Sequence, residues 1–260
     1  MPLSSRIRAM AAPHWLTLFG LILAGWVALY AMALPPGMVA AANLYGVEFW
    51  QSLCVVTPDL AGYWGVAAMW AVMVAAMMAP TFLPALATYD DLIHSGAATR
   101  AGFGLLLVGY LMIWLGFSAV AAGLQITLYR AGLVSPVGQS LTPWLSGALL
   151  IGAGAYQFSA IKEACLTQCR EPLTFFMQHW RPGLRNPIEL GLRLGALCLG
   201  CCWALMLLGF VGGVMNLAFM GLATLIMIFE KLPDLGRHLT KPLGWGLIAA
   251  GIAAIANALI

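Results

Sequence analysis

Three cysteines crowd one short apolar stretch of this sequence, at Cys198, Cys201 and Cys202. At about 100° per residue of an α-helix, Cys198, Cys202 and Met206 share one face, whereas Cys201 projects about 100° away from Cys202. Thiolate and thioether sulfurs are the ligands that soft ions prefer, above all Cu(I). The stretch therefore predicts a soft-metal site inside a helix.

A second sulfur stripe has the same four-residue spacing. Met69, Met73 and Met77 follow one another at helical intervals, with Met78 beside them and Pro80 just beyond. Methionine also fills irregular gaps in hydrophobic cores, so packing is the alternative interpretation of this stripe. A zinc site of mixed Cys and His ligands is disfavoured, because the histidines fall in loops or near segment ends.

Cys165 and Cys169 form a further pair at helical spacing, flanked by Lys162 and Arg170. Nearby positive charge favours the thiolate that metal binding requires, so this pair is predicted to receive or deliver ions at the cytoplasmic face. The alternative is a pair of reduced thiols without a role. Cys54 has no partner evident from the sequence.

Polar residues beside these motifs are predicted to hold helices together. Tyr156, Gln157, Lys162 and Glu230 lie near the ends of apolar segments, where hydrogen bonds and ion pairs between helices are expected. A paired anchor near the membrane surface is the simpler interpretation of Glu230 and its neighbour Lys231.

The composition indicates what these residues are embedded in. The 260 residues are 62% hydrophobic and 8% charged, with a mean hydropathy of +0.93. Such a chain is expected to lie mostly in lipid, as a single integral membrane domain over residues 1–260. The net charge of +3 and the absence of a basic run exclude nucleic acid as a partner.

Runs of about twenty apolar residues predict membrane-spanning helices. The chain is thus predicted to be an all-α, polytopic bundle of about seven spans, the first retained rather than cleaved as a signal peptide. The predicted spans are roughly 14–34, 62–86, 101–129, 142–162, 188–212, 216–230 and 243–260.

Basic residues are distributed unevenly between the two sides of this predicted bundle. One side receives only Arg130, and the side rich in Lys and Arg is expected to be cytoplasmic. The N-terminus is then cytoplasmic and the C-terminus outside. The other side receives Arg6, Arg8, Arg100, Lys162, Arg170, Arg181, Arg185, Arg193, Lys231, Arg237 and Lys241.

A short pattern recurs in two of the predicted spans. Trp70-Ala71-Val72-Met73 resembles Trp203-Ala204-Leu205-Met206, three spans later. This favours a three-plus-three inverted repeat followed by one C-terminal helix, an arrangement common in transporters. Chance similarity between apolar segments is the alternative.

Several motifs together resemble a known bacterial family. They are Met77-Met78-Ala79-Pro80, Tyr156-Gln157, Lys162, Cys165, Cys169-Arg170-Glu171-Pro172, Gly200-Cys201-Cys202-Trp203, Met206, Met215-Asn216 and Glu230-Lys231. The set, over roughly residues 60–240, is similar to the predicted metal-binding integral membrane proteins called domain of unknown function 2182. The resemblance implies a multi-span protein of the bacterial inner membrane with a loose link to copper handling.

Three functions follow as hypotheses. The first is a membrane protein that binds Cu(I), or another soft metal, and transfers or transports it, with a metallochaperone or membrane protein as partner. The second is a non-catalytic assembly factor or accessory subunit whose Gly191-x3-Gly195 and Gly209-x3-Gly213 faces pack against a membrane protein. The third, a thiol-disulfide oxidoreductase, is weakened by the depth of Cys198 and Cys201 in lipid. A non-enzymatic role is favoured, and no catalytic residue is assigned.

Overall fold

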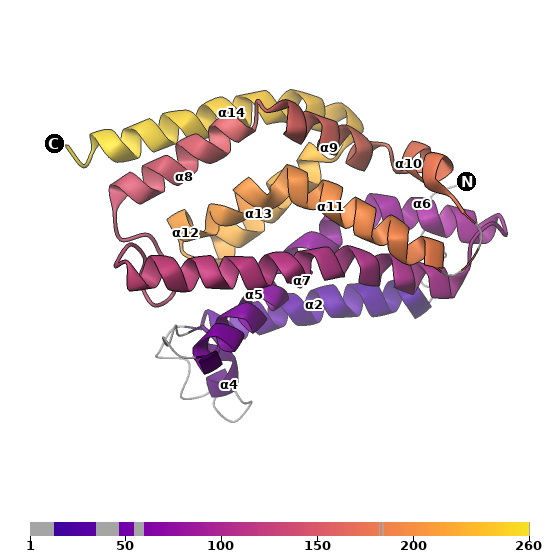
Figure 1. Cartoon of the computed structure of the whole chain (residues 1–260), viewed down its shortest axis with the longest axis horizontal. Coiled ribbons are helices and arrows are strands. Elements are labelled where there is room, and N and C mark those ends of the chain that lie inside the picture. Colours follow the sequence, from indigo (N-terminus) through magenta and orange to yellow (C-terminus); the bar gives the residue numbers. More distant parts are fainter. Residues whose placement is uncertain (1–12, 35–46, 55–59, 182, 184, 260) are drawn as a thin grey trace.

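The computed structural model describes residues 13–34, 47–54, 60–181, 183 and 185–259 (Figure 1). Apart from an isolated bridge between Val134 and Ser140, every regular element in these ranges is a helix, which confirms the predicted all-α class. The helices are α2 (Pro13–Met32), α4 (Val47–Ser52), α5 (Leu60–Thr81), α6 (Leu83–His94), α7 (Arg100–Arg130), α8 (Pro143–Tyr156), α9 (Ala160–Arg170), α10 (Pro172–His179), α11 (Arg185–Leu207), α12 (Gly209–Gly212), α13 (Leu217–Glu230) and α14 (Pro233–Ala256).

Five of these helices are long and apolar enough to cross a membrane: α2, α5, α7, α14 and α11 taken together with α12. Two predicted spans differ from a simple membrane-crossing helix. Segment 142–162 covers α8 and the first residues of α9, and these two helices are bent by 63° after Tyr156. Segment 216–230 is α13, whose 14 residues extend only about 21 Å. The long apolar helices fit a membrane protein, while the count of seven spans stays a prediction.

The predicted span 62–86 is also shorter in the structure. Helix α5 contains Pro80 and ends at Thr81, and α6 begins at Leu83 with Pro84 in its first turn. Proline lacks a backbone donor and is tolerated in a first helical turn, which is why the chain can start a new helix here. The end of α5 therefore stops inside the protein, close to the cysteines of α11.

Glycines determine how α7 and α11 pack. A Cβ placed on Gly191 would collide with the carbonyl oxygen of Leu106, and one on Gly109 would collide with that of Ile188. A Cβ placed on Gly195 would likewise lie only 2.9 Å from the carbonyl oxygen of Tyr110. Small residues let two backbones approach this closely. The Gly191-x3-Gly195 face, predicted to bind another membrane protein, is thus used within the chain.

Replacing Gly191 by alanine is expected to destabilise the protein by about 1–3 kcal/mol, because the new methyl group overpacks a backbone contact. Thermal unfolding of the purified protein in detergent would measure the loss. Gly104→Ala, on a face of α7 that does not contact α11, is the control, since nothing lies within 4 Å of its would-be Cβ. Equal unfolding temperatures for the two variants would contradict this packing.

A second glycine-rich contact joins α8 to α14. Gly147 and Gly251 face each other along one part of this pair, and Gly154 and Gly244 along another. In Figure 1 these two helices run together along the upper edge, α2 lies along the lower edge, and α7 and α11 lie between them. The cysteines of α11 are therefore placed in the interior of the bundle.

The two tryptophan motifs occupy different surroundings. Trp70 is fully buried, donates to Gln125 Oε1 at 2.7 Å and packs against Phe210, whereas Trp203 is 37% exposed and lies against Tyr156. The repeated sequence does not reproduce one local environment. The inverted repeat stays a prediction.

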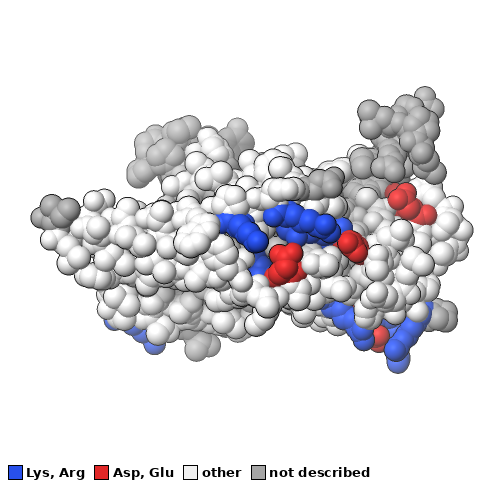
Figure 2. Space-filling view, turned by 90° about the horizontal axis from the view of Figure 1, so that it is seen from above, with Lys and Arg blue, Asp and Glu red and all other residues white. Residues whose placement is uncertain are grey.

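Charged side chains gather on one part of the surface. Figure 2 shows most of the visible Lys and Arg side chains over one half of the face in view, interspersed with Asp and Glu, and a largely uncharged surface over the other half. This division fits the uneven distribution of basic residues along the sequence. Arg6 and Arg8, which the orientation prediction also uses, lie outside the described residues.

Candidate metal centre

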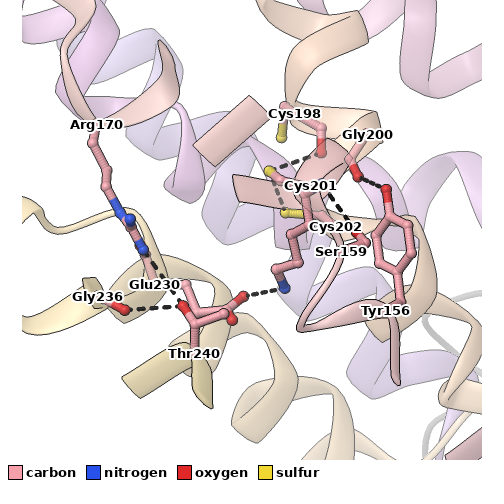
Figure 3. A network of polar contacts seen from close by, with 11 residues as sticks. Tyr156, Ser159, Arg170, Cys198, Gly200, Cys201, Cys202, Glu230, Gly236 and Thr240 are labelled. Atoms are coloured by element: carbon pink, nitrogen blue, oxygen red, sulfur yellow. Dashed lines mark hydrogen bonds and ion pairs between the residues drawn. The ribbon is translucent and has the colours of Figure 1, made fainter. Parts of the chain in front are cut away.

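The three cysteines of α11 form one compact group. Their sulfurs all lie within 4.8 Å of one another, and each residue is 1% exposed. Cys201 Sγ lies 3.3 Å from Cys202 Sγ and donates to the Cys198 carbonyl oxygen at 3.2 Å, as Figure 3 shows. With metal–sulfur bonds of about 2.3 Å, three sulfurs around a trigonal ion lie about 4 Å apart. The group therefore has suitable dimensions for one soft ion.

Helix α9 brings a second pair of cysteines to the same place. After the 63° bend, Ser159 caps α9 and the helix packs along α11. A Cβ on Gly200 would lie 2.7 Å from Cys165 Sγ, so Cys165 rests directly on α11. Cys169 lines the same small cavity as Cys198. The sequence predicted two separate stations, but the bend folds the pair back onto the cluster.

Buried charges hold α9 in this position. Lys162 Nζ lies 2.9 Å from Glu230 Oε2, and both side chains are 1% exposed. Arg170 donates from Nε to the Glu230 carbonyl oxygen at 2.9 Å and from Nη2 to Thr240 Oγ1 at 3.5 Å (Figure 3). Removing one partner from a buried ion pair leaves an uncompensated charge, so these contacts resist separation of α9 from α13.

The other predicted polar contacts behave differently from each other. Tyr156 donates its hydroxyl to the Gly200 carbonyl oxygen at 2.5 Å, which joins the end of α8 to the cysteine segment of α11. Gln157 is buried against Gly244 of α14, and its Oε1 has no hydrogen-bond partner among the described residues. Tyr156 thus links two helices by a hydrogen bond, whereas Gln157 contacts α14 by packing.

A buried lysine contacts the first cysteine of the cluster. Lys231 Nζ lies 2.9 Å from Cys198 Sγ and 2.8 Å from Thr81 Oγ1. Tyr110 hydroxyl lies 3.0 Å from the same sulfur and donates to the Met78 carbonyl oxygen at 3.2 Å. The end of α5, the middle of α7 and the end of α13 therefore converge on Cys198.

A small cavity of about 10 Å³ borders this convergence. This volume has room for about one water molecule, so the cavity could hold one ion but no additional ligand molecule. Cysteines of both helices line it, together with Lys231. The lining residues are Thr81, Phe82, Pro84, Ala85, Tyr110, Cys169, Leu194, Cys198 and Lys231.

The methionine stripe lies beside this group rather than inside it. On α5, Trp70 faces α7 through Gln125, and Ala76 faces α2 through Gly25. These two faces are about 120° apart, and the stripe lies between them, with Met73 about 60° from each. Helix α13 is the remaining major neighbour of α5. The stripe residues Met69, Met73, Met77 and Met78 are all buried.

Two methionines nearest the cysteines contribute differently. Met78 joins the Cys198 network through its main-chain carbonyl oxygen. Met206 is buried one helical turn beyond Cys202 on α11. Among the described residues, no hydrogen bond joins a methionine sulfur to the three clustered sulfurs. The methionines are thus neighbours of the centre, and their role as ligands stays a prediction.

Sequence reasoning did not assign Tyr110, Thr81 or Lys231 to the site. Lys231 alone carried a signal, because a charged residue directly after an apolar helix requires either water or a partner. Thr81 and Tyr110 are single polar residues in apolar segments, a pattern that is too common to distinguish them. Their proximity follows from the packing of α5, α7, α11 and α13.

Comparison of the chain with known proteins identifies its family. Residues 67–254 match the family model described as PpoB2, copper chaperone. The chain belongs to the PpoB2 copper chaperone family. No curated protein and no solved structure matches the chain.

The PpoB2 match covers both cysteine-bearing helices and Lys231, while Cys54 lies before it. Together with the compact cysteine cluster, membership supports copper as the ion that this site would bind. The resemblance to domain of unknown function 2182 spans nearly the same residues and stays a prediction. A copper-related family is what the sequence motifs predicted, and the PpoB2 match bears that out.

Proposed function

We propose that the chain is a membrane-embedded copper chaperone that binds Cu(I) at Cys198, Cys201 and Cys202 and passes it on by thiol exchange. The observation that carries the proposal is the convergence of two cysteine helices and one buried ammonium on a single small cavity. Copper is the cargo here, held only until another ligand takes it. The expected location is the bacterial inner membrane, with the cysteine helices near the cytoplasmic side.

Lys231 supplies the charge that such a complex needs. A Cu(I) ion held by two thiolates and one protonated thiol of the cluster carries one net negative charge, and burying an unpaired charge is costly. The Lys231 ammonium, 2.9 Å from Cys198 Sγ, is placed to balance that charge. Lys231 would thus lower the free-energy cost of burying the copper-bound cluster in the apolar interior.

Cys169 and Cys165 are suited to exchange. Cu(I) accepts two or three sulfur ligands, so an incoming thiolate can bind before an earlier one leaves. Each thiol that takes the ion releases its proton, and each sulfur that leaves can regain one, so no electron is transferred. Cys169, which lines the same cavity as Cys198, would take the ion first, and Cys165 lies one turn earlier on the same helix. The partner is then a metallochaperone or a membrane protein that docks beside α9.

The other hypotheses are less well supported. Thiol-disulfide exchange requires access to the attacking sulfur, and each cysteine of the cluster is 1% exposed. The assembly-factor hypothesis loses its Gly191-x3-Gly195 face, because that face packs against α7. Delivery of copper to a membrane metalloprotein would satisfy the accessory role without such a face.

Copper transfer from the reduced protein tests this function. We expect Cys169→Ser to keep the bound Cu(I) but to release it to a soluble Cu(I) acceptor about tenfold or more slowly, because an exchange ligand is lost while the three-cysteine group remains. Stopped-flow transfer to a chromogenic acceptor protein would measure the rate.

Met177→Leu is the control for this experiment, because Met177 lies on α10 and is 75% exposed, whereas the cluster cysteines are buried. The proposal requires its transfer rate to equal that of the unmodified chain. Absence of bound copper in the unmodified chain, or an unchanged rate in Cys169→Ser, would contradict the proposed exchange.

A further inference from the structure

A second pair of sulfurs lies at the opposite ends of α5 and α13 from the cysteine cluster. Cys54 Sγ lies 3.5 Å from Met215 Sδ, and the Cys54 thiol also approaches the Trp50 carbonyl oxygen at 3.6 Å. Cys54 is buried, and Met215 is partly buried. Residues 161 positions apart thus present one thiol and one thioether to each other. No partner for Cys54 is evident from the sequence, and the fold supplies one.

We propose that Cys54 and Met215 form a second, weaker Cu(I) site, at which copper enters or leaves the protein on the side opposite the cysteine cluster. This proposal rests on the proposed copper-chaperone function. It adds a site outside the α9–α11 cluster, and Cys54 lies outside the residues that match the family.

The chemistry of the pair suits a soft monovalent ion. A thiol and a thioether are both soft ligands, and neither oxygen nor imidazole is in the pair to favour a harder ion. Two metal–sulfur bonds of about 2.3 Å span at most about 4.6 Å, so the sulfurs must separate by about 1 Å to accommodate an ion between them. Met215 has the three rotatable side-chain bonds needed for that adjustment.

Copper binding at this pair requires no change of oxidation state. Cu(I) forms one bond to Cys54 Sγ and one to Met215 Sδ, and the thiol proton leaves to water. The pair offers two sulfur ligands, whereas the cluster offers three, so the pair is expected to bind copper more weakly.

Two parallel helices connect this pair to the cluster. Cys54 precedes α5 and Met215 precedes α13, whereas Thr81 at the end of α5 contacts Lys231 at the end of α13. The 14 residues of α13 set the two sites about 21 Å apart along that helix. Weak binding at the one end and stronger binding at the other would give copper a direction.

Buried thioethers occupy the interval between the two sites. The two helices pack together, and each carries buried methionines along its length. Along α13, Met220 and Met227 are seven residues apart and so lie on one face, which also carries buried Thr224. Thioether ligands bind Cu(I) without holding a proton, so they suit intermediate positions. The buried methionines of the two helices are Met69, Met73, Met77, Met78, Met220 and Met227.

Cu(I) titration of the full-length protein in detergent, against a chromogenic Cu(I) chelator and under reducing conditions, tests this site. We expect the unmodified chain to bind a tight equivalent and a weaker one. In Cys54→Ser and in Met215→Leu only the weaker one should weaken, by about tenfold or more, because each variant loses one of two soft ligands. Met112→Leu, which alters an exposed methionine of α7, should change neither.

A cluster-deficient variant separates this inference from the proposed function. With Cys198, Cys201 and Cys202 replaced by serine, the weaker equivalent should remain and should disappear on adding Met215→Leu. If that variant does not fold, the titrations of the single variants decide the question alone. A weaker equivalent that is absent, or that survives both Cys54→Ser and Met215→Leu, would overturn the second site while leaving the first intact. Absence of the tight equivalent from the unmodified chain, with the weaker one present, would instead overturn the proposed function.

Discussion

Serine at all three positions of the α11 cluster, Cys198, Cys201 and Cys202, is expected to lower Cu(I) affinity by at least about a thousandfold, or about 4 kcal/mol of binding free energy. The hydroxyl group is a hard ligand that Cu(I) does not favour, and it occupies nearly the same space as the thiol. Competition with a chromogenic Cu(I) chelator would measure the affinity, and elemental analysis of protein purified from copper-supplemented cells would measure the copper bound.

Single substitutions refine this result. Cys198→Ser is expected to have the largest effect of the three, because Cys198 alone contacts both Lys231 and Tyr110. The folded state is checked by comparing thermal unfolding without copper. An unfolding temperature like that of the unmodified chain, combined with unchanged copper binding in the triple variant, would show that the α11 cluster is not the site.

Lys231→Met is expected to weaken Cu(I) binding by roughly 10- to 100-fold, the range found when a group supporting metal ligands is lost. Methionine retains the length of the side chain but removes the positive charge beside Cys198. The loaded centre would then carry an unbalanced negative charge in an apolar interior. The same chelator competition gives the affinity, at two salt concentrations to show that a buried charge, screened little by salt, is responsible.

Two further substitutions make this prediction specific to the buried charge. Lys231→Arg keeps the charge and should bind copper more tightly than Lys231→Met, although the larger guanidinium must fit beside Thr81. Lys241→Met removes a charge from an exposed position of α14 and should change nothing. Equal affinities for Lys231→Met and Lys241→Met would refute the charge-balancing role of Lys231.

Helix class and the cysteine helix itself were predictable because their signals are local. Apolar runs of twenty residues, and cysteines at helical spacing around Cys198, require no knowledge of distant contacts. The copper-related family was predictable for a similar reason, since its motifs are short. These features depend on residues within one or two helical turns of each other.

The rest depends on contacts between distant segments. The 63° bend after Tyr156 turns a predicted cytoplasmic pair, Cys165 and Cys169, onto α11 beside the cluster, and apolar patterning does not encode such an angle. Lys231 was interpreted as an anchor at a membrane surface because its partner Cys198 lies 33 residues away. Met215 approaches Cys54 across 161 residues, which no spacing rule could reveal.

The size of the cavity beside Cys198 has a consequence for which ions the protein can hold. At about 10 Å³ it has no room for a hydration shell. Mg²⁺ gives up its water reluctantly, and a hydrated divalent ion would have to shed its whole shell to enter. Cu(I) can instead be handed from sulfur to sulfur as a bare ion. Discrimination would therefore come from the cost of dehydration as well as from ligand preference, and abundant hard cations would be rejected without any competition for the thiols.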